Sequence, residues 1–319
     1  MTRLSAILIA ALALALPLSL LAGRIWIVPW SEPVPNASVI LAELRLPRSV
    51  LALIIGAGLG GAGAAMQGYL RNPLADPGLF GIAPGAAFGA VMALFLGLAA
   101  IPFMLPAFAL LGAGGAMALL ALIAGRTGGI ALFTLAGLMI ASLAGTLTSL
   151  AISLSPNPFA MSEIVTWLMG ALIDRSWSDV WIAAPLTLAG LIVLWACGPS
   201  LDAMMLGEEA ALSLGVEARR LQWAIVIGIG LTIGAGVAVA GIVGFVGLMV
   251  PHLGRPFTDR RPSSLLVPSA LAGALLVLVA DIFCRLAPVA GELRLGIALS
   301  LLGAPFFLAL LLRLRRQLA

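Results

Sequence analysis

Long apolar runs separated by short polar segments dominate this sequence. Each run lasts about 20 residues, the length that a helix needs to cross the hydrocarbon core of a bilayer. The first run, 4–22, lacks a convincing small-residue cleavage site, so it is interpreted as a membrane span rather than as a signal peptide. The pattern predicts an all-α polytopic membrane protein of about ten transmembrane helices, at about 4–22, 45–66, 82–98, 103–125, 130–153, 180–197, 221–240, a short span ending at 251–252, 264–284 and 295–312.

One strongly polar segment, residues 206–220, interrupts this pattern. The stretch LGEEAALSLGV predicts a short helix at about 206–216 with acids near its start, where the helix dipole favours them. Gly207 and Gly215 bracket it as start and stop. The segment is either a solvated loop helix between two spans or a docking element for a soluble partner.

Composition excludes several kinds of chemistry. Hydrophobic residues make up 62% and charged residues 9% of the 319 residues, with a mean hydropathy of +1.18, which excludes a soluble fold. All 17 basic residues are arginine, and a Walker A loop or a Schiff-base enzyme each needs a lysine. If ATP drives transport, the nucleotide must therefore bind another polypeptide.

Metal and disulfide chemistry is equally restricted. His252 is the single histidine, and Cys197 and Cys284 are the only cysteines. A metal site of the His/Cys type needs three or four converging ligands, so no metal site is expected within one copy. The predicted topology places the two cysteines on opposite sides of the membrane, so no disulfide is expected.

Glycines inside the predicted spans indicate close helix packing. Gly56, Gly58 and Gly61 spell the dinucleotide fingerprint GxGxxG, but no strand precedes them and the surroundings are apolar. Gly56 and Gly60 instead form a GxxxG pair that lets a neighbouring helix approach. After the fifth span, the tryptophans and charges of 155–180 predict an interfacial helix at about 158–173 on the outer side.

Several long motifs resemble the FecCD-type permeases, the membrane subunits of ABC importers for iron-siderophores, haem and cobalamin. They are LGEEAALSLGV at 206–216, RLPR at 45–48, the stretches 63–86 and 241–255, and GAPFF at 303–307. The resemblance implies a type II ABC importer permease fold, with 1–319 as a single transmembrane permease domain. It also implies a homodimer in the bacterial inner membrane, two cytoplasmic ATP-binding subunits, a periplasmic substrate-binding protein, and a bulky iron chelate (siderophore), haem or cobalamin as the cargo. No cofactor is expected on this chain, and ATP and Mg would bind to the partner subunit.

The same resemblance implies roles for individual residues. Arg45, Arg48 and Arg285 would grip acidic residues of the periplasmic binding protein, because an arginine fork pairs carboxylates bidentately. Snorkelling to the interface is the alternative for each of them, and Asp281, four residues before Arg285 on the same helix face, is placed to pair with it. His252 and Arg255 would fix a cytoplasmic loop near the ATPase contact. The predicted ATPase-coupling residues are Leu206, Gly207, Glu208, Glu209, Ala210, Ala211, Leu214 and Gly215.

The distribution of arginine predicts the orientation of the chain. Arginine is enriched on the cytoplasmic side of membrane proteins. With both termini cytoplasmic, eleven arginines lie inside (3, 71, 126, 219, 220, 255, 260, 261, 313, 315 and 316) and six outside (24, 45, 48, 175, 285 and 294). A glycine-rich span followed by a proline-containing break occurs at 49–77 and again at 221–256, which suggests an inverted repeat.

Two other function classes fit less well. An ion-coupled secondary transporter normally needs an acid near the middle of the membrane, whereas all 13 acids are predicted in loops or close to span ends. A membrane-embedded enzyme would lack an acid–base constellation. One departure from the family pattern is Arg294, which replaces a proline and either contacts the cargo or the binding protein, or snorkels.

Overall fold

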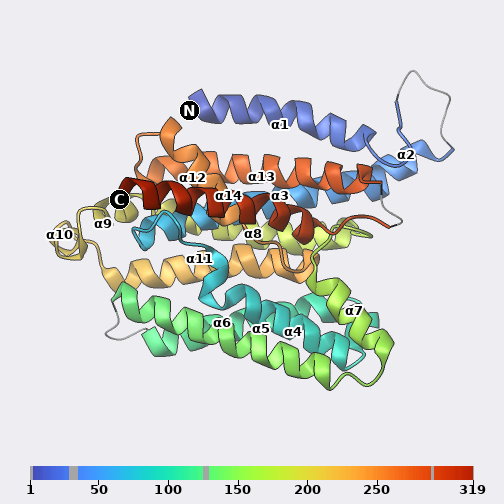
Figure 1. Cartoon of the computed structure of the whole chain (residues 1–319), viewed down its shortest axis with the longest axis horizontal. Helices are drawn as coiled ribbons and strands as arrows, with labels where there is room; N and C mark the ends of the chain where they lie inside the picture. Colours follow the sequence, from blue (N-terminus) through green and yellow to red (C-terminus); the bar gives the residue numbers. More distant parts are fainter. Residues whose placement is uncertain (1–2, 29–34, 125–128, 289–290, 319) are drawn as a thin grey trace.

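The computed structural model describes residues 3–28, 35–124, 129–288 and 291–318, so Arg126, predicted on the cytoplasmic side, lies outside the described residues. Within the described residues, eight helices are long and apolar enough to cross a membrane. Figure 1 shows them side by side in one bundle. Both termini and the short helix α10 (Glu208–Ser213) lie at one end, and the short helix α2 (Ala37–Val39) lies at the other. These are called the α10 end and the α2 end. The long helices are α1 (Arg3–Leu21), α3 (Leu46–Tyr69), α5 (Met104–Ala124), α6 (Ile130–Ser153), α8 (Trp177–Ala196), α11 (Ala218–Ala240), α13 (Pro262–Leu286) and α14 (Leu295–Leu318), and α3 continues a lead-in of α2 (Ala37–Val39) and the π-helix η1 (Ile40–Arg45).

Two predicted spans are short helices. The third, α4 (Ile82–Phe95), ends before its predicted end at 98, because Gly97 takes a left-handed φ of 69° and the chain turns into the 3₁₀ helix η3 (Leu98–Ala100). The eighth, α12 (Val246–Gly254), is as short as predicted. The chain unwinds between α11 and α12, starting at Gly241 with φ 72°. Most residues of α4 and α12 are buried, and the unwound segment between α11 and α12 lines a cavity, a setting in which irregular backbone is tolerated at membrane depth.

The centre of the bundle is built on close contact between α3 and α13. A Cβ at Gly56 would collide with the carbonyl oxygen of Gly273, and one at Gly60 with that of Ser269. The prediction that Gly56 and Gly60 serve helix packing is therefore confirmed. Because these residues carry no side chain, the two backbones touch over two turns, and α3 is buried along most of its length.

Short helices complete the two ends. Helix α7 lies after α6, as predicted, but it ends at Leu168 rather than near 173, since Gly170 adopts φ 68° and packs against the carbonyl of Ile242. Cys197 and Cys284 are buried free thiols in separate hydrophobic clusters. The remaining short elements are α7 (Pro158–Leu168), α9 (Gly198–Met204), α10 (Glu208–Ser213), η2 (Pro77–Phe80) and η4 (Arg255–Phe257).

Candidate functional site

Helix α10 protrudes at one end of the bundle, where Figure 1 shows it beyond α9. Gly207 precedes it with φ 106°, and Gly215 follows it with φ 84°, so the predicted bracketing is confirmed. Both angles favour glycine, which has no Cβ to clash. Ala211 is the buried residue of α10, whereas Leu212 within the helix and the flanking Leu206 and Leu214 are exposed. The structure thus presents a short helix whose outer surface combines exposed leucines with the exposed acids Glu208 and Glu209.

Two contacts anchor α10 and the preceding α9 to the spans. Glu208 lies 3.9 Å from the Arg71 guanidinium just after α3. Asp202 of α9 accepts a hydrogen bond of 2.9 Å from the Ser263 backbone N–H, and thereby caps the first turn of α13. The sequence analysis missed Asp202, because its partner lies 61 residues later in the chain.

His252 and Arg255 lie where α12 meets α3. The Arg255 guanidinium donates to Gln67 Oε1 at 3.1 Å, and Gln67 Nε2 donates to the Leu248 carbonyl at 3.1 Å. The His252 ring packs edge-on against Phe306 of α14, with centroids 6.0 Å apart. Gln67 was missed, although a glutamine inside an apolar span is a recognisable signal of a buried polar contact.

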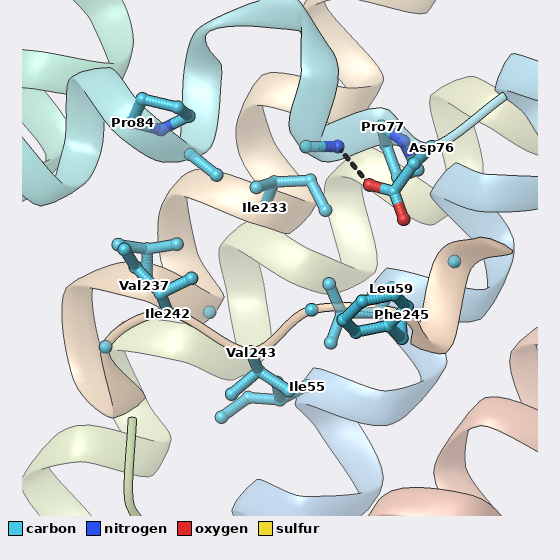
Figure 2. Close-up of a pocket in the computed structure, with 16 residues that line it drawn as sticks. Ile55, Leu59, Asp76, Pro77, Pro84, Ile233, Val237, Ile242, Val243 and Phe245 are labelled. Atoms are coloured by element: carbon cyan, nitrogen blue, oxygen red, sulfur yellow. Dashed lines mark hydrogen bonds between the residues drawn. The ribbon is translucent and has the colours of Figure 1, made fainter. Parts of the chain in front are cut away.

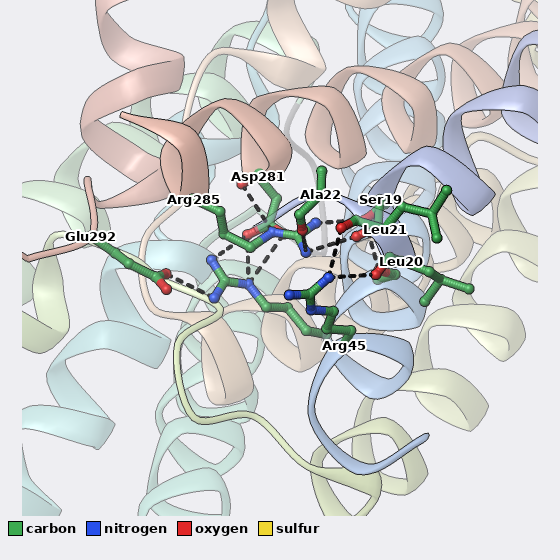
Figure 3. Close-up of polar contacts among 10 residues, drawn as sticks. Ser19, Leu20, Leu21, Ala22, Arg45, Asp281, Arg285 and Glu292 are labelled. Atoms are coloured by element: carbon green, nitrogen blue, oxygen red, sulfur yellow. Dashed lines mark hydrogen bonds and ion pairs between the residues drawn. The ribbon is translucent and has the colours of Figure 1, made fainter. Parts of the chain in front are cut away.

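The three arginines predicted for docking gather at the α2 end, where Arg48 and Arg285 point into the protein and Arg45 is half-buried. Arg48 is 9% exposed, with one nitrogen 2.8 Å from Asp281 and another 2.7 Å from Glu292. Arg285, 5% exposed, lies 3.1 Å from the same Asp281, as the sequence predicted. Asp281 thus pairs with both guanidinium groups, and Figure 3 shows it beside Arg285. Neither arginine snorkels.

Backbone carbonyls of α1 complete this arginine cluster. Arg285 donates to the Ser19 carbonyl at 2.8 Å and to its hydroxyl at 2.6 Å. Arg45 donates to the carbonyls of Leu20 and Leu21, each at 2.8 Å. The cluster therefore ties the end of α1 to α3 and α13 (Figure 3).

A cavity of about 350 Å³ opens beside the arginine cluster. Five arginines and two acids line it, which gives a formal charge of +3. A positive hollow of this kind can accept a carboxylate from another molecule. The charged lining residues are Arg24, Arg45, Arg48, Asp174, Arg175, Arg285 and Glu292.

A smaller cavity of about 140 Å³ lies in the middle of the bundle, where Figure 2 shows Asp76 and Pro77 facing the unwound segment after α11. It is also lined by Ile55 and Leu59 of α3. Asp76 accepts a hydrogen bond of 2.7 Å from the Gly78 N–H. Asp76 lies in a loop, as the sequence predicts for the acids, but this loop folds back so that it reaches the middle of α3. Its fold-back could not be read from the local sequence.

Arg294 lines a separate cavity of about 520 Å³ together with Glu163, Asp174 and Arg175. It lies at the α2 end, next to α7. Arg294 therefore borders a cavity that also contains two acids. This position is compatible with contact to a solute or to a partner protein.

Residues 5–313 match the FecCD transport family. This chain belongs to the FecCD transport family. Among its relatives, the vitamin B12 import system permease protein BtuC of Vibrio cholerae is 38% identical over 93% of this chain and 89% of the relative. BtuC of Escherichia coli O9:H4 is 37% identical over 95% of this chain and 93% of its own length. An uncharacterized ABC transporter permease of Bacillus subtilis, YvrB, is 39% identical over 88% of this chain and 81% of its own length.

Solved structures agree with this FecCD membership. A metal-chelate type ABC transporter in an inward-facing conformation superposes with a TM-score of 0.90 at 30% identity, covering 98% of this chain and 99% of that one. PsaBC from Streptococcus pneumoniae, in complex with a Fab, has a TM-score of 0.56 at 17% identity over 82% of this chain and 88% of its own, and shares the fold alone. The FecCD resemblance and the all-α polytopic fold predicted from the sequence are confirmed.

As a FecCD protein, the chain is a multi-pass permease subunit of an ABC importer and is not itself an ATPase. In this family ATP binds to a partner ATPase, and import also involves a binding protein. The ion-coupled and enzymatic alternatives are therefore set aside, and Asp76 belongs to the core of an importer.

Proposed function

We propose that two copies of this chain form the membrane pathway of an importer for a bulky metal chelate, with cobalamin as the first choice among cobalamin, haem and iron-siderophores. The observation that carries the choice is the identity of 37–38%, over nearly the whole chain, to permeases named for vitamin B12 import. ATP and Mg²⁺ bind to the partner subunit. The chain lies in the bacterial inner membrane with both termini and α10 in the cytoplasm, as the excess of arginine at that end supports.

Helix α10 is proposed as the contact to the ATPase. Its exposed Leu206, Leu212 and Leu214 suit an apolar groove, and Glu208 and Glu209 give it an acidic start. The coupling surface comprises Leu206, Gly207, Glu208, Glu209, Ala210, Ala211, Leu214 and Gly215. Motion of the ATPase would reach the spans through the anchors of Glu208 to Arg71 and of Asp202 to Ser263, while His252 and Arg255 keep the neighbouring loop in place.

The cavity beside the arginine cluster is proposed as the docking point for the periplasmic binding protein. Arg45, Arg48 and Arg285 provide its positive wall, and Asp281 and Glu292 offset only part of their charge. Arg45 is the arginine that an incoming carboxylate meets without breaking an ion pair, because it donates only to carbonyl groups. A rim contact of this kind mainly sets the rate of association and its salt dependence.

The exposed face of α6 supports a pathway shared between two copies. Ser142, Gly145, Thr146 and Ser149 follow the spacing of one helix face and are exposed. The hydroxyls of Thr146 and Ser149 bond back to carbonyls of the same helix at 2.9 and 3.0 Å. A polar face on a membrane helix favours water or protein over lipid as its neighbour. A second copy would supply the opposite wall.

The test is uptake by the full importer, reconstituted in liposomes with its ATPase and its binding protein. We expect ATP-dependent uptake of labelled cobalamin, and loss of at least about tenfold in Glu208→Arg combined with Gly215→Trp, because one change places two cations together and the other puts a bulky side chain at φ 84°. Glu217→Gln is the control, since Glu217 lies in the same loop and pairs only with the exposed Arg220. Uptake of a ferric siderophore or haem without cobalamin would replace the first choice of cargo, and full uptake by the double variant would contradict the coupling role of α10.

A further inference from the structure

A second cavity of about 350 Å³ lies at the α10 end, between the end of α3 and the turn from α12 to α13. Three arginines, a histidine and a glutamine supply its polar wall, and no carboxylate is found among the described residues that line it. The remaining lining is apolar or proline. The polar lining residues are Gln67, Arg71, His252, Arg255 and Arg260.

The positive charge of this cavity is poorly neutralised. Within the described part of the chain, Arg255 and Arg260 form no ion pair, and Arg71 lies a long 3.9 Å from Glu208. Burial and the neighbouring Arg260 guanidinium both lower the pKa of Arg255. An arginine side chain does not lose its proton in a protein, so Arg255 and Arg260 both stay charged and repel each other.

Unused hydrogen-bonding groups accompany the charge. One guanidinium nitrogen of Arg255 donates a hydrogen bond of 3.1 Å to Gln67. Its Nε and the Nδ1 atom of His252 are buried and have no hydrogen-bond partner among the described residues. A buried polar atom without a partner is costly, so these two atoms indicate a missing partner.

Nearby arginines outside the cavity are neutralised. Arg261, next to Arg260 in the same turn, lies 3.6 Å from Asp259, and Arg220 lies 2.7 Å from Glu217. At the α2 end, Arg48 forms ion pairs with Asp281 and Glu292. Within the described residues, Arg255 and Arg260 therefore differ from these paired arginines in having no carboxylate partner.

We propose that this cavity binds a phosphate group, either in the headgroup of an anionic phospholipid or as free phosphate. A guanidinium fork matches the oxygens of a phosphate bidentately, and three arginines around one hollow can hold several of its oxygens. The hollow is far larger than the volume of about 30 Å³ that one water occupies in the liquid. It lies at the ends of apolar spans, the depth at which headgroups lie, and basic pockets between spans suit anionic headgroups.

Binding can be measured on the purified full chain. Thermal unfolding and native mass spectrometry would be recorded with dioleoyl phosphatidylglycerol, with the zwitterionic phosphatidylcholine of the same chains, and with inorganic phosphate against chloride at equal ionic strength. The variants are Arg255→Gln with Arg260→Gln, and Arg260→Gln alone in case loss of the Gln67 contact impairs folding. Arg261→Gln is the matched control, because Arg261 is adjacent to Arg260 and paired outside the cavity.

We expect phosphatidylglycerol to stabilise the chain more than phosphatidylcholine does, and its apparent affinity to fall about tenfold in the double variant and severalfold in Arg260→Gln, with less than a twofold change in Arg261→Gln. Stabilisation by inorganic phosphate as well would assign the site to phosphate in general, and stabilisation by the lipid alone would assign it to the headgroup. Equal affinity in all variants, or no preference for either phosphate source over its control, overturns the proposal. Loss of ATPase binding in the double variant with unchanged anion binding also overturns it, and would assign the arginines to a carboxylate of the partner.

Discussion

At the scale of single residues, Asp281 is a buried carboxylate shared by two arginines. It is 1% exposed, and its carboxylate lies between the guanidinium groups of Arg48 and Arg285. Arg285 could be assigned to it from the sequence, because four residues separate them on one helix. Arg48 could not, because it lies 233 positions before Asp281 in the chain and only the packing of α3 on α13 brings the two together.

We expect Asp281→Asn to destabilise the chain by about 3 kcal/mol, because removing one partner of a buried ion pair leaves the remaining charges uncompensated. Here two arginines lose their shared carboxylate, and only Glu292 remains beside Arg48. The measurement is thermal unfolding of the purified chain in one detergent. Glu217→Gln serves as the control, since the exposed pair of Glu217 and Arg220 is worth at most about 1 kcal/mol. Equal unfolding temperatures for the two variants would contradict the role given to Asp281.

At the scale of elements, α3 lies at the centre of the bundle, because its glycines let the backbones of other helices come into contact with it. Gly56 and Gly60 meet α13, and Gly63 meets the backbone of α12 at Gly247. The spacing of the first two predicted a close helix contact, but it named no partner. The contact of Gly63 with α12 depends on the unwound segment that joins α11 to α12, and the position of that segment depends on how the other helices pack.

We expect Gly56→Ala to lower stability by about 1–3 kcal/mol, because the new Cβ meets the Gly273 carbonyl and the helices must separate. Gly114→Ala is the matched control within α5, since a Cβ at Gly114 has nothing within 4 Å. Alanine favours a helix over glycine, so the control is expected to be neutral or slightly stabilising. The measurement is thermal unfolding of both variants in the same detergent. An unchanged unfolding temperature for Gly56→Ala would mean that the α3–α13 contact is looser than the structure has it.

At the scale of the whole molecule, the bundle separates two charged ends. The α10 end carries both termini, α10 and the arginine-lined phosphate cavity, and the α2 end carries the arginine cluster with its acids (Figure 1). An even number of passes returns the C-terminus to the side of the N-terminus. The arginine excess at that end is the observation behind the proposal that this side is cytoplasmic.

We therefore expect reporters fused to either terminus to behave as cytoplasmic, with fluorescent GFP and inactive alkaline phosphatase. Alkaline phosphatase inserted in the exposed turn at 154–157, between α6 and α7, should be active. These three fusions test the orientation independently of transport. An active phosphatase at the C-terminus with an inactive one at the N-terminus would require an odd number of passes.

The sequence by itself determined the features that depend on neighbouring residues. These are the approximate spans, the glycines that bracket α10, the pair of Asp281 with Arg285, and the excess of arginine at one end. Each is encoded in a run of residues or a helical spacing, so local patterns suffice.

Only the tertiary structure decided which distant residues share a site. It turned two predicted docking arginines inward onto Asp281 and Glu292, and it brought the Asp76 loop to the middle of α3. It also gathered Arg71, Arg255 and Arg260 around one cavity without a carboxylate among its described lining. Such contacts join residues far apart in the chain, and they depend on how glycine-rich helices pack, which the spacing of one helix does not specify.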